Sequence, residues 1–473
     1  MHPCLNLQLL FPQVPLMRMP LRPRHDFGRQ VCMIKEYLNK RFFSFLTLIF
    51  CSGSSLAMTL PIMSLYLMNE VHADGSQLGN FFIISAVSGI IVTQIIAKFS
   101  DSKLSRRDLM ILGYSAGALT TLTYIFFPDY GIIVTAGVAF SSISMVATPQ
   151  VFALAREYAL LKYGDALMFT SYLRAVFSLS WVMTPPIAYV LFVDYGSRFT
   201  FMVATMIFLT GALVAFFMMP KALFKSGSEH DFEDTPSSSI GDLMDTENSN
   251  ETGRNSQSEA HAEDVKGDST SGFKNLLKSG NVMSIVFLFL AFMLLWCCNS
   301  AYLISMPVFV TREASVAGTL IDTNRLPGVM MGLAALLEIP VMIYCGGLAR
   351  KIGLKTLIIL CGCFGCLFYV SLSFGPISSV SLLFMQIFNA IFIGILASLG
   401  MVYMQELLPK FPGQATTLYN NSVHTGGIIS GYLVSRAMSA GGTVLVFETG
   451  IVFTAIAVVL LFAVSGVGIS RKD

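Results

Sequence analysis

Residues 97–107 read AKFSDSKLSRR, and residues 346–355 read GGLARKIGLK. Each stretch is a short basic segment between two long apolar stretches, and their first residues, Ala97 and Gly346, are 249 positions apart. A repeat at a constant offset indicates that the chain folds as two similar halves. Halves of this kind, each made of apolar segments, are typical of membrane transporters that bind a ligand between them.

The composition places the chain in a lipid bilayer. Of its 473 residues 54% are hydrophobic and only 12% are charged, whereas charged residues make up about 25% of a typical soluble protein. Stretches of about 20 apolar residues can cross the hydrocarbon core as helices. Twelve candidate spans run over residues 42–68, 78–98, 108–127, 131–154, 166–193, 199–219, 282–310, 327–349, 356–375, 379–403, 414–435 and 444–468.

The distribution of positive charge predicts the orientation of these spans. Twelve spans put both termini on one side of the membrane, and 25 of the 30 Lys and Arg residues lie in the tails or in loops on that side. The other five are Arg198, Arg312, Arg325 and Arg436 in the opposite loops, and Arg174 within a span. Because cytoplasmic loops retain positive charge, we expect both termini in the cytoplasm.

The spans divide the chain into five predicted regions. They are a basic N-terminal arm (1–41), a six-helix bundle (42–219), an acidic linker (220–281), a second six-helix bundle (282–468) and a short cytoplasmic tail (469–473). The arm is either a cytoplasmic extension or an artefact of the start codon, since Met33 could also begin the chain. The linker carries twelve Asp and Glu between residues 226 and 272 and few apolar residues, so we expect it to be disordered, with a regulatory role as the alternative.

Two ionisable residues lie deep in predicted spans, where charged side chains are costly and seldom persist without a task. Glu338 falls near the middle of the span 327–349, where burial disfavours the charged form. That suits a group that exchanges protons or contacts substrate, and a structural hydrogen bond is the alternative. Arg174 shares a polar face of the span 166–193 with Trp181. It either lines a cavity, where it pairs with Glu338 or with substrate hydroxyls, or extends toward the cytoplasm.

Further polar and aromatic residues recur at helical spacing in three spans of the second half. They are Trp296, Asn299 and Tyr302, then Gln386 and Asn389, and finally Asn421 and His424. Amides can bind sugar hydroxyls and an aromatic plane can cover a sugar ring, so this set favours a polyhydroxyl ligand. Hydrogen bonding between helices is the alternative, and His424 either titrates or only donates a hydrogen bond. The small residues Ser85 and Ala86 are interpreted as helix packing.

The basic loop after the second span is a candidate cytoplasmic gate. Asp101 can form a charge latch with Arg106 and Arg107 beside helix ends, and that latch must break for a cavity to open. Arg156 and Glu157, at the end of the fourth span, are assigned to the same gate. Orientation of the loop by positive charge is the alternative, and it explains the arginines but not Asp101.

Several longer blocks of sequence resemble one family. They are TPQVFALAREYA (148–159), SYLRAVFSLSWVMTPPIAYVL (171–191), PGVMMGLAALLEIP (327–340), NAIFIGIL (389–396) and ATTLYNNS (415–422). These blocks are similar to the bacterial sugar efflux transporter family of the major facilitator superfamily. The resemblance implies an all-α membrane protein of twelve transmembrane helices in two six-helix bundles. It also implies export of sugars such as lactose and glucose, or of glycosides, across the bacterial inner membrane in exchange for protons.

The resemblance is not complete. Leu104 replaces the usual glycine of the basic loop, and Thr184-Pro185-Pro186 falls where antiporter relatives have a Gly-Pro bend. On this interpretation the chain is a monomer whose partners are a small sugar or glycoside, protons and the bilayer, with no nucleic acid. A proton-coupled multidrug exporter of the same superfamily is the alternative. No metal-ligating or catalytic constellation is apparent, so neither a cofactor nor enzymatic activity is expected.

Overall fold

The computed structural model describes residues 40–100, 105–163, 167–219, 282–314, 316, 321–409 and 412–464. The chain divides into a unit of residues Met1–Phe43 and a unit of residues Ser44–Asp473, and the packing reported below is that of the second unit. Within the described ranges all regular structure is helical. The acidic linker, the C-terminal tail and residues 1–39 of the predicted arm lie outside these ranges.

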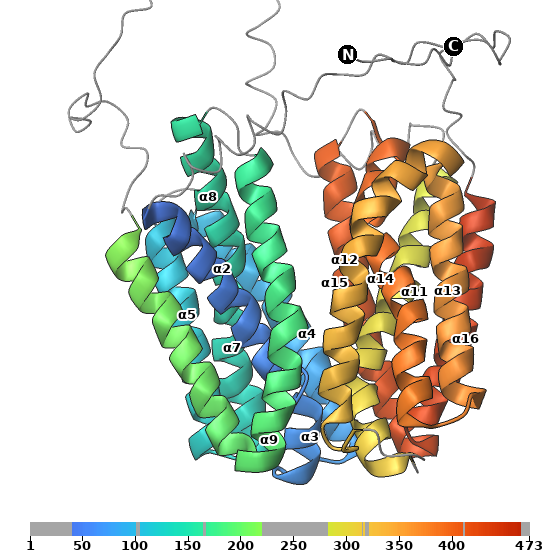
Figure 1. Ribbon diagram of the computed structural model, residues 1–473, viewed down its shortest axis with the longest axis horizontal. Coiled ribbons are helices and arrows are strands. Elements are labelled where there is room, and N and C mark those ends of the chain that lie inside the picture. The colour runs from blue at the N-terminus through green and yellow to red at the C-terminus, as the bar shows by residue number, and fades with distance from the viewer. Residues whose placement is uncertain are drawn as a thin grey trace, which may run out of the picture. The chain divides into compact units, whose positions relative to one another are not determined.

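The first half of the chain forms six helical segments of membrane length (Figure 1). The first segment consists of α2 (Lys40–Thr59) and α3 (Met63–Asn69), which are separated by a break at Pro61. The next elements are α4 (Gly75–Ser100), α5 (Arg106–Phe126), a composite of α6 (Tyr130–Ile132), η1 (Ile133–Gly137), α7 (Val138–Ser144) and α8 (Ala147–Tyr163), and then α9 (Leu167–Met218). α9 comprises two helices, because Gly196 in its interior has a φ of 83°, a left-handed conformation that favours glycine.

The second half repeats this arrangement. Its helices are α11 (Val282–Val308), extended by η2 (Phe309–Glu313), α12 (Leu326–Ile352), α13 (Leu354–Phe374), α14 (Ser379–Leu407), α15 (Pro412–Gly441) and α16 (Thr443–Ala463). Ten segments in the described ranges are long and apolar enough to cross a membrane. The division of α9 at Gly196 adds an eleventh helix, and the more polar α15, with 30 residues, adds a twelfth. The prediction of twelve helices in two bundles is confirmed.

The two halves meet mainly along two pairs of helices, α4 with α15 and α9 with α12, and α3 also contacts α11. Glycines permit both contacts. A methyl group on Gly79 would come within 2.3 Å of the Gly431 carbonyl oxygen, and one on Gly332 would come within 2.7 Å of the Val182 carbonyl oxygen. The backbones therefore approach as closely as small residues allow, which is how helices commonly associate in membranes.

The consecutive prolines of α9 explain the second of these contacts. Pro186 has no N–H, so the Val182 carbonyl oxygen loses its helical donor and faces Gly332 instead. The carbonyl oxygen of Pro185 similarly lies 2.8 Å from the position of a methyl group on Gly328. The Pro-Pro stretch that was compared with a Gly-Pro bend in the sequence thus lies against the other half of the molecule.

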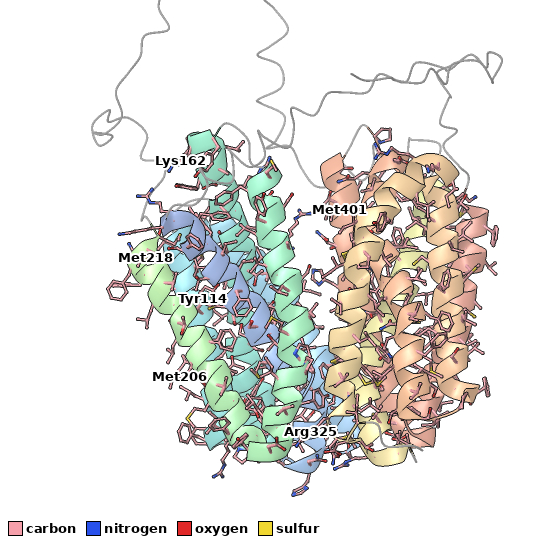
Figure 2. The ribbon with its side chains drawn as sticks, viewed as in Figure 1. Tyr114, Lys162, Met206, Met218, Arg325 and Met401 are labelled. Carbon is pink, nitrogen blue, oxygen red and sulfur yellow. The ribbon has the colours of Figure 1, made fainter. Side chains whose placement is uncertain are left out.

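The opposite ends of the bundles are easily told apart. Figure 2 shows Arg325 at one end, here called the far end, and Lys162 and Met401 at the other. The second is called the terminal end, because α16, the last described helix, ends there (Figure 1).

Polar contacts join the two halves at the far end. Arg325 Nη2 lies 2.5 Å from Asp194 Oδ1, at the junction of the two helices within α9. Arg312, in η2, donates to the Met68 carbonyl oxygen at 3.2 Å near the end of α3. Two of the four arginines in the loops opposite the termini thus bind the other half, and the far end of the structure is closed.

The closed far end predicts a specific cross-link. Ser435 Oγ of α15 lies 3.4 Å from Ser76 Oγ of α4, so a S76C/S435C pair should form a disulfide on mild oxidation. It is measured by non-reducing electrophoresis after cleavage at a protease site inserted between residues 219 and 282, where only a cross-link keeps the halves together. S88C/S435C is the control, because Ser88 lies about 18 Å further along α4. Equal cross-linking of both pairs would contradict the reported closure.

Candidate functional site

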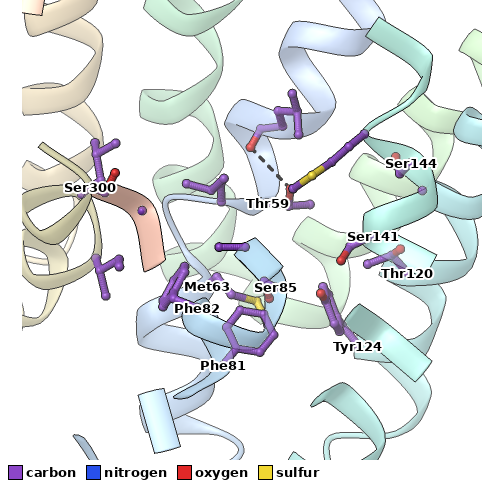
Figure 3. A pocket seen from close by; sticks show the side chains of 18 of the residues that line it. Thr59, Met63, Phe81, Phe82, Ser85, Thr120, Tyr124, Ser141, Ser144 and Ser300 are labelled. Atoms are coloured by element: carbon purple, nitrogen blue, oxygen red, sulfur yellow. Dashed lines mark hydrogen bonds between the residues drawn. The ribbon is translucent and has the colours of Figure 1, made fainter. Parts of the chain in front are cut away.

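A cavity of about 330 Å³ lies in the first bundle where it meets α11 and α15 (Figure 3). This volume falls in the range of small-molecule binding pockets. The lining residues are Leu56, Thr59, Leu60, Met63, Phe81, Phe82, Ser85, Ala86, Gly117, Thr120, Thr121, Tyr124, Ser141, Ser144, Met145, Phe208, Ser300, Leu303, Ile304, Gly427 and Ser430. Both halves of the molecule therefore contribute to one pocket.

The break between α2 and α3 forms part of the cavity wall. Pro61 has no N–H and its ring clashes with the preceding turn, so the helix ends at Thr59 and a new one begins at Met63. Thr59, Leu60 and Met63 all line the cavity. Irregular backbone at membrane depth is tolerated where it is buried in protein or borders a cavity, and this break fits that rule.

Hydroxyl groups dominate the polar surface of the cavity. They belong to Thr59, Ser85, Thr120, Thr121, Tyr124, Ser141, Ser144, Ser300 and Ser430. Several donate to a carbonyl of their own helix, as Thr120 does to the Ala116 oxygen at 3.0 Å and Ser430 to the Gly427 oxygen at 2.7 Å. Their oxygen lone pairs stay free to accept from a ligand. Ser85 Oγ is buried and has no hydrogen-bond partner among the described residues.

Aromatic rings supply the apolar surface. The rings of Phe81 and Phe82 meet edge to face with centroids 5.2 Å apart. Two residues that do not line the cavity position Tyr124. Tyr66 Oη donates to the Tyr124 carbonyl oxygen at 2.7 Å, and the centroids of the Phe201 and Tyr124 rings are 5.3 Å apart. Phe208 approaches α5 because Gly117 has no side chain in its way. The lining contains no Asp, Glu, Lys, Arg or His, so the cavity suits an uncharged ligand with hydroxyls and an apolar face.

None of the predicted site residues lines this cavity. Tyr302, Gln386 and Asn389 do come together, with Tyr302 Oη and Asn389 Nδ2 at 3.3 and 3.2 Å from Gln386 Oε1. The cluster is buried inside the second bundle, where the Tyr302 ring packs on Phe368 at 5.0 Å. In this conformation the three side chains bind one another, and their contact with a ligand stays a prediction.

Four other predicted residues border the cavity toward the terminal end. Trp296 and Asn299 precede the lining residues Ser300 and Leu303 by four positions on α11, and His424 precedes Gly427 by three on α15. Residues three or four apart share a helix face, and Asn421 continues the α15 face by one further turn. These side chains therefore stand above the cavity on the faces that lead into it.

Helix packing puts the two faces at the same depth. A methyl group on Gly426 of α15 would come within 2.9 Å of the Cys297 backbone nitrogen of α11. His424 and Trp296 thus occupy neighbouring turns of adjacent helices. We call the set of Trp296, Asn299, Asn421 and His424 the polar rim, and its role in binding stays a prediction.

The intramembrane ion pair considered in the sequence is not present in this structure. Arg174 is exposed, Trp181 and Glu338 are half-buried, and the structure records no ion pair between Arg174 and Glu338. The Glu338 carboxyl group makes no hydrogen bond with any described residue. It lies in the middle of α12, whose next turn packs on α14, since a methyl group on Gly394 would meet the Val341 side chain at 2.8 Å. Its carboxyl is therefore available to a proton or ligand.

The predicted gate is only partly described. Asp101 lies outside the described residues. Arg106, at the start of α5, binds Glu157 near the end of α8, with Nη2 2.6 Å and Nε 2.8 Å from Oε1, and its Nη1 lies 3.2 Å from Gln150 Oε1. Arg156 is exposed and has no partner among the described residues. The first bundle thus has an internal latch at its terminal end, between Arg106 and Glu157.

The second arginine of the loop, Arg107, contacts α9 instead. Arg107 Nη2 donates to the Phe216 carbonyl oxygen at 2.5 Å, and its guanidinium lies 5.1 Å from the centre of the Phe216 ring. The second half has a matching contact, because Lys355 Nζ, at the start of α13, donates to the Val464 carbonyl oxygen at 2.6 Å. In each half a cation at the start of the third helix holds the end of the sixth.

The twelve-helix fold and a cavity shared by two bundles define a secondary-transporter architecture. The sequence profile of the Major Facilitator Superfamily matches residues 45–431, and the chain belongs to that superfamily. The solved structure of the nucleoside transporter NupG shares the fold, with a TM-score of 0.66 at 14% identity over 90% of this chain and 98% of that one.

Two curated relatives place the chain more closely. It is 35% identical over 390 residues to Sugar efflux transporter A of Dickeya chrysanthemi, covering 82% of this chain and 87% of that protein. It is 33% identical over 426 residues to Sugar efflux transporter A of Escherichia coli K12, covering 90% and 95%. Within the superfamily the chain belongs to the family of these proteins, which confirms the resemblance seen in the sequence.

The cavity itself was not anticipated. Ser85 and Ala86 were interpreted as packing residues, yet both line it. The spacing of Ser85 from Phe81 and Phe82 on α4 was a signal, since residues three or four positions apart share a helix face, which puts the hydroxyl beside the rings. Serines and threonines are also common packing residues in membranes, so that signal alone does not distinguish a cavity from a helix contact.

The Arg106–Glu157 latch predicts a measurable coupling. Both side chains are about one-third exposed, so we expect an interaction of about 0.5 to 1 kcal/mol. R106A and E157A should each lower the melting temperature in detergent by about 1 to 3 °C, and R106A/E157A should lower it by less than their sum. R156A is the control, because Arg156 has no partner among the residues that the structure describes. Additive effects at low salt would exclude the latch.

Proposed function

We propose that this protein is a secondary transporter that exports sugars or glycosides across the bacterial inner membrane. The observation that carries the proposal is the cavity between the halves, which combines nine hydroxyl-bearing residues with aromatic rings and carries no charged side chain. Sugars present hydroxyls and an apolar ring face, so each surface of the cavity has a counterpart on such a ligand. The names of the two relatives, both sugar efflux transporters, support the same ligand class.

The orientation proposed from the arginine and lysine distribution determines which side of the membrane each end of the structure faces. With both termini in the cytoplasm, the closed far end faces the outside and the terminal end faces the cytoplasm. A sugar would then reach the cavity from the cytoplasm past the polar rim. Export follows when the α4–α15 and α9–α12 contacts open and the terminal end closes, which is a rigid-body exchange between two states.

Proton exchange is the proposed source of energy. Glu338 is half-buried in the middle of α12 and has no ion-pair partner among the described residues, and the sequence contains no glycine-rich phosphate loop. A carboxyl in that place can release its proton to the cytoplasm and bind another from outside. Arg174 and His424 are the other titratable or charged groups proposed for this pathway, and the transporter is proposed to act as a monomer.

A proton-coupled multidrug exporter is the second candidate. The apolar part of the lining, with Met63, Met145 and three phenylalanines, would also accept a lipophilic compound. Such exporters commonly handle cations, and a cation needs an acidic partner inside a dry cavity. This cavity has none among its lining residues, which favours the sugar.

Transport into inverted membrane vesicles tests the proposal directly. With an inside-acid pH gradient, radiolabelled lactose should accumulate, and a protonophore should abolish the accumulation. A fluorescent cationic drug should not accumulate under the same conditions. Accumulation of the drug alone would move the protein to the multidrug branch.

The cavity can be tested in the same assay by removing one hydroxyl. S85A deletes the unpaired Ser85 Oγ, and the loss of one neutral hydrogen bond of about 0.5 to 1.5 kcal/mol should raise the KM about 2- to 10-fold. S142A is a matched control, because Ser142 Oγ is also buried without a partner among the described residues but lies outside the cavity lining. An equal effect of the two changes would place the ligand elsewhere.

Neutralising Glu338 should separate coupling from substrate movement. E338Q should abolish accumulation driven by the pH gradient, because the amide cannot carry a proton, while lactose exchange between equal concentrations persists. Glu406, exposed at the end of α14, supplies the control E406Q, which should retain the driven accumulation. Full accumulation by E338Q would remove Glu338 from the proton pathway.

A further inference from the structure

Tyr189 of α9 lies between the cavity wall and the second half of the molecule. Its side chain is completely buried, with 0% exposure. It belongs to a hydrophobic core that contains Ile62 and Met63 of the first half and Ala301 and Ile304 of the second. Tyr189 itself does not line the cavity, so its side chain cannot shift without displacing a neighbour.

The hydroxyl group of Tyr189 binds the backbone at the break between α2 and α3. Tyr189 Oη donates a hydrogen bond of 2.9 Å to the Pro61 carbonyl oxygen. Pro61 is flanked by Leu60 and followed closely by Met63, and both of these line the cavity. A ligand that presses on this wall therefore displaces the carbonyl to which Tyr189 is bound.

The other end of Tyr189 touches α12. A methyl group on Gly328 would come within 2.8 Å of Tyr189 Cδ2 and 2.9 Å of Tyr189 Cβ. Gly328 also faces the Pro185 carbonyl oxygen. The Tyr189 ring and the backbone of the Pro-Pro stretch therefore contact the same position of α12. The contact is made at the backbone of α12, which cannot yield as a flexible side chain would.

We propose that Tyr189 is a positioning residue that couples occupancy of the cavity to the α9–α12 contact between the halves. The proposal rests on the proposed function only in assuming that the halves move. When the Pro61 carbonyl shifts, the Tyr189 hydroxyl either follows it or is left unpaired in a buried site, which is costly. If it follows, its ring moves against Gly328 and weakens the contact that keeps the far end closed.

A second buried tyrosine provides a matched control. Tyr114 Oη donates to the Leu48 carbonyl oxygen of α2 at 2.7 Å. Like Tyr189 it is fully buried and binds a carbonyl of the first segment. It lies inside the first bundle, however, away from the Pro61 break and from α12. Y114F and Y189F therefore remove the same chemical group, and only the second should affect coupling.

The test uses the S76C/S435C cross-link in the full-length chain as a readout of the far end. This pair joins α4 to α15 and contains neither Tyr189 nor the break. L60W fills the cavity from the wall without any added ligand, and Leu60 is 37% exposed, so the larger side chain has room. The cross-linked fraction is compared with and without L60W in three backgrounds: the otherwise unchanged chain, Y189F and Y114F.

We expect L60W to lower the rate of cross-linking several-fold in the unchanged and Y114F backgrounds, and by less than about two-fold in Y189F. Equal effects of L60W in Y189F and Y114F would overturn the proposal. So would the absence of any L60W effect in the unchanged chain, because then the cavity wall is not coupled to the far end. Melting temperatures of the variants show whether each is folded.

Transport kinetics provide a second measurement, one that would not change if Tyr189 had only a structural role. Y189F should lower kcat for lactose export at least about ten-fold while KM stays within about two-fold, and Y114F should change neither. A KM effect alone would make Tyr189 a binding residue and overturn the coupling. If the unchanged chain transports no lactose, the proposed substrate fails, but the ligand-free cross-linking experiment still decides the role of Tyr189.

Discussion

The structure depends on how it satisfies backbone groups that have left a helix inside the membrane. No water is available there, so each such group needs a partner from the protein. Pro61 breaks the first segment, and its carbonyl oxygen is bound by Tyr189 at 2.9 Å. Pro186 frees the Val182 carbonyl oxygen, which faces Gly332. Both irregularities involve contacts of α9, one with the break in the first segment and the other with α12 of the second half.

The two irregularities have different consequences. The break at Pro61 opens the wall of the cavity, because the chain between α2 and α3 no longer fills the space of a continuous helix. The prolines of α9 expose backbone toward α12, and the glycines at 328 and 332 convert that exposure into a close contact between halves. α9 therefore joins the wall of the cavity to the contact surface between the halves. An alternating-access mechanism needs such a connection.

Charged residues have a more limited part in this conformation. Arg325 and Asp194 close the far end across the halves, and Arg106 and Glu157 tie α5 to α8 within one half. These pairs are partly exposed, and exposed ion pairs contribute little to stability. The cavity excludes charge altogether, which leaves Glu338 and the polar rim as the groups that would connect a neutral ligand to a proton gradient.

The sequence by itself determined the membrane location, the twelve helices and the two-fold internal repeat. These follow from the length and polarity of continuous stretches, which are local properties. It assigned Arg106 and Glu157 to one candidate gate but expected Arg106 to pair with Asp101, and only the tertiary structure decided that Arg106 binds Glu157. Helical spacing put Gln386 with Asn389 on one span and Tyr302 with Trp296 and Asn299 on another, and only the tertiary structure decided that Tyr302, Gln386 and Asn389 bind one another in the second bundle rather than line the cavity.

The position of the cavity and the contacts of Tyr189 were decided by tertiary structure alone. Ser85 and Ala86 have the composition of helix-packing residues, and they line a cavity because the neighbouring helices are rotated and broken so as to leave space beside them. Tyr189 contacts Pro61 and Gly328, which lie more than a hundred positions before and after it in the chain. Packing between helices sets the rotation of each helix and decides which distant residues become its neighbours. A linear pattern of hydrophobicity does not contain this information.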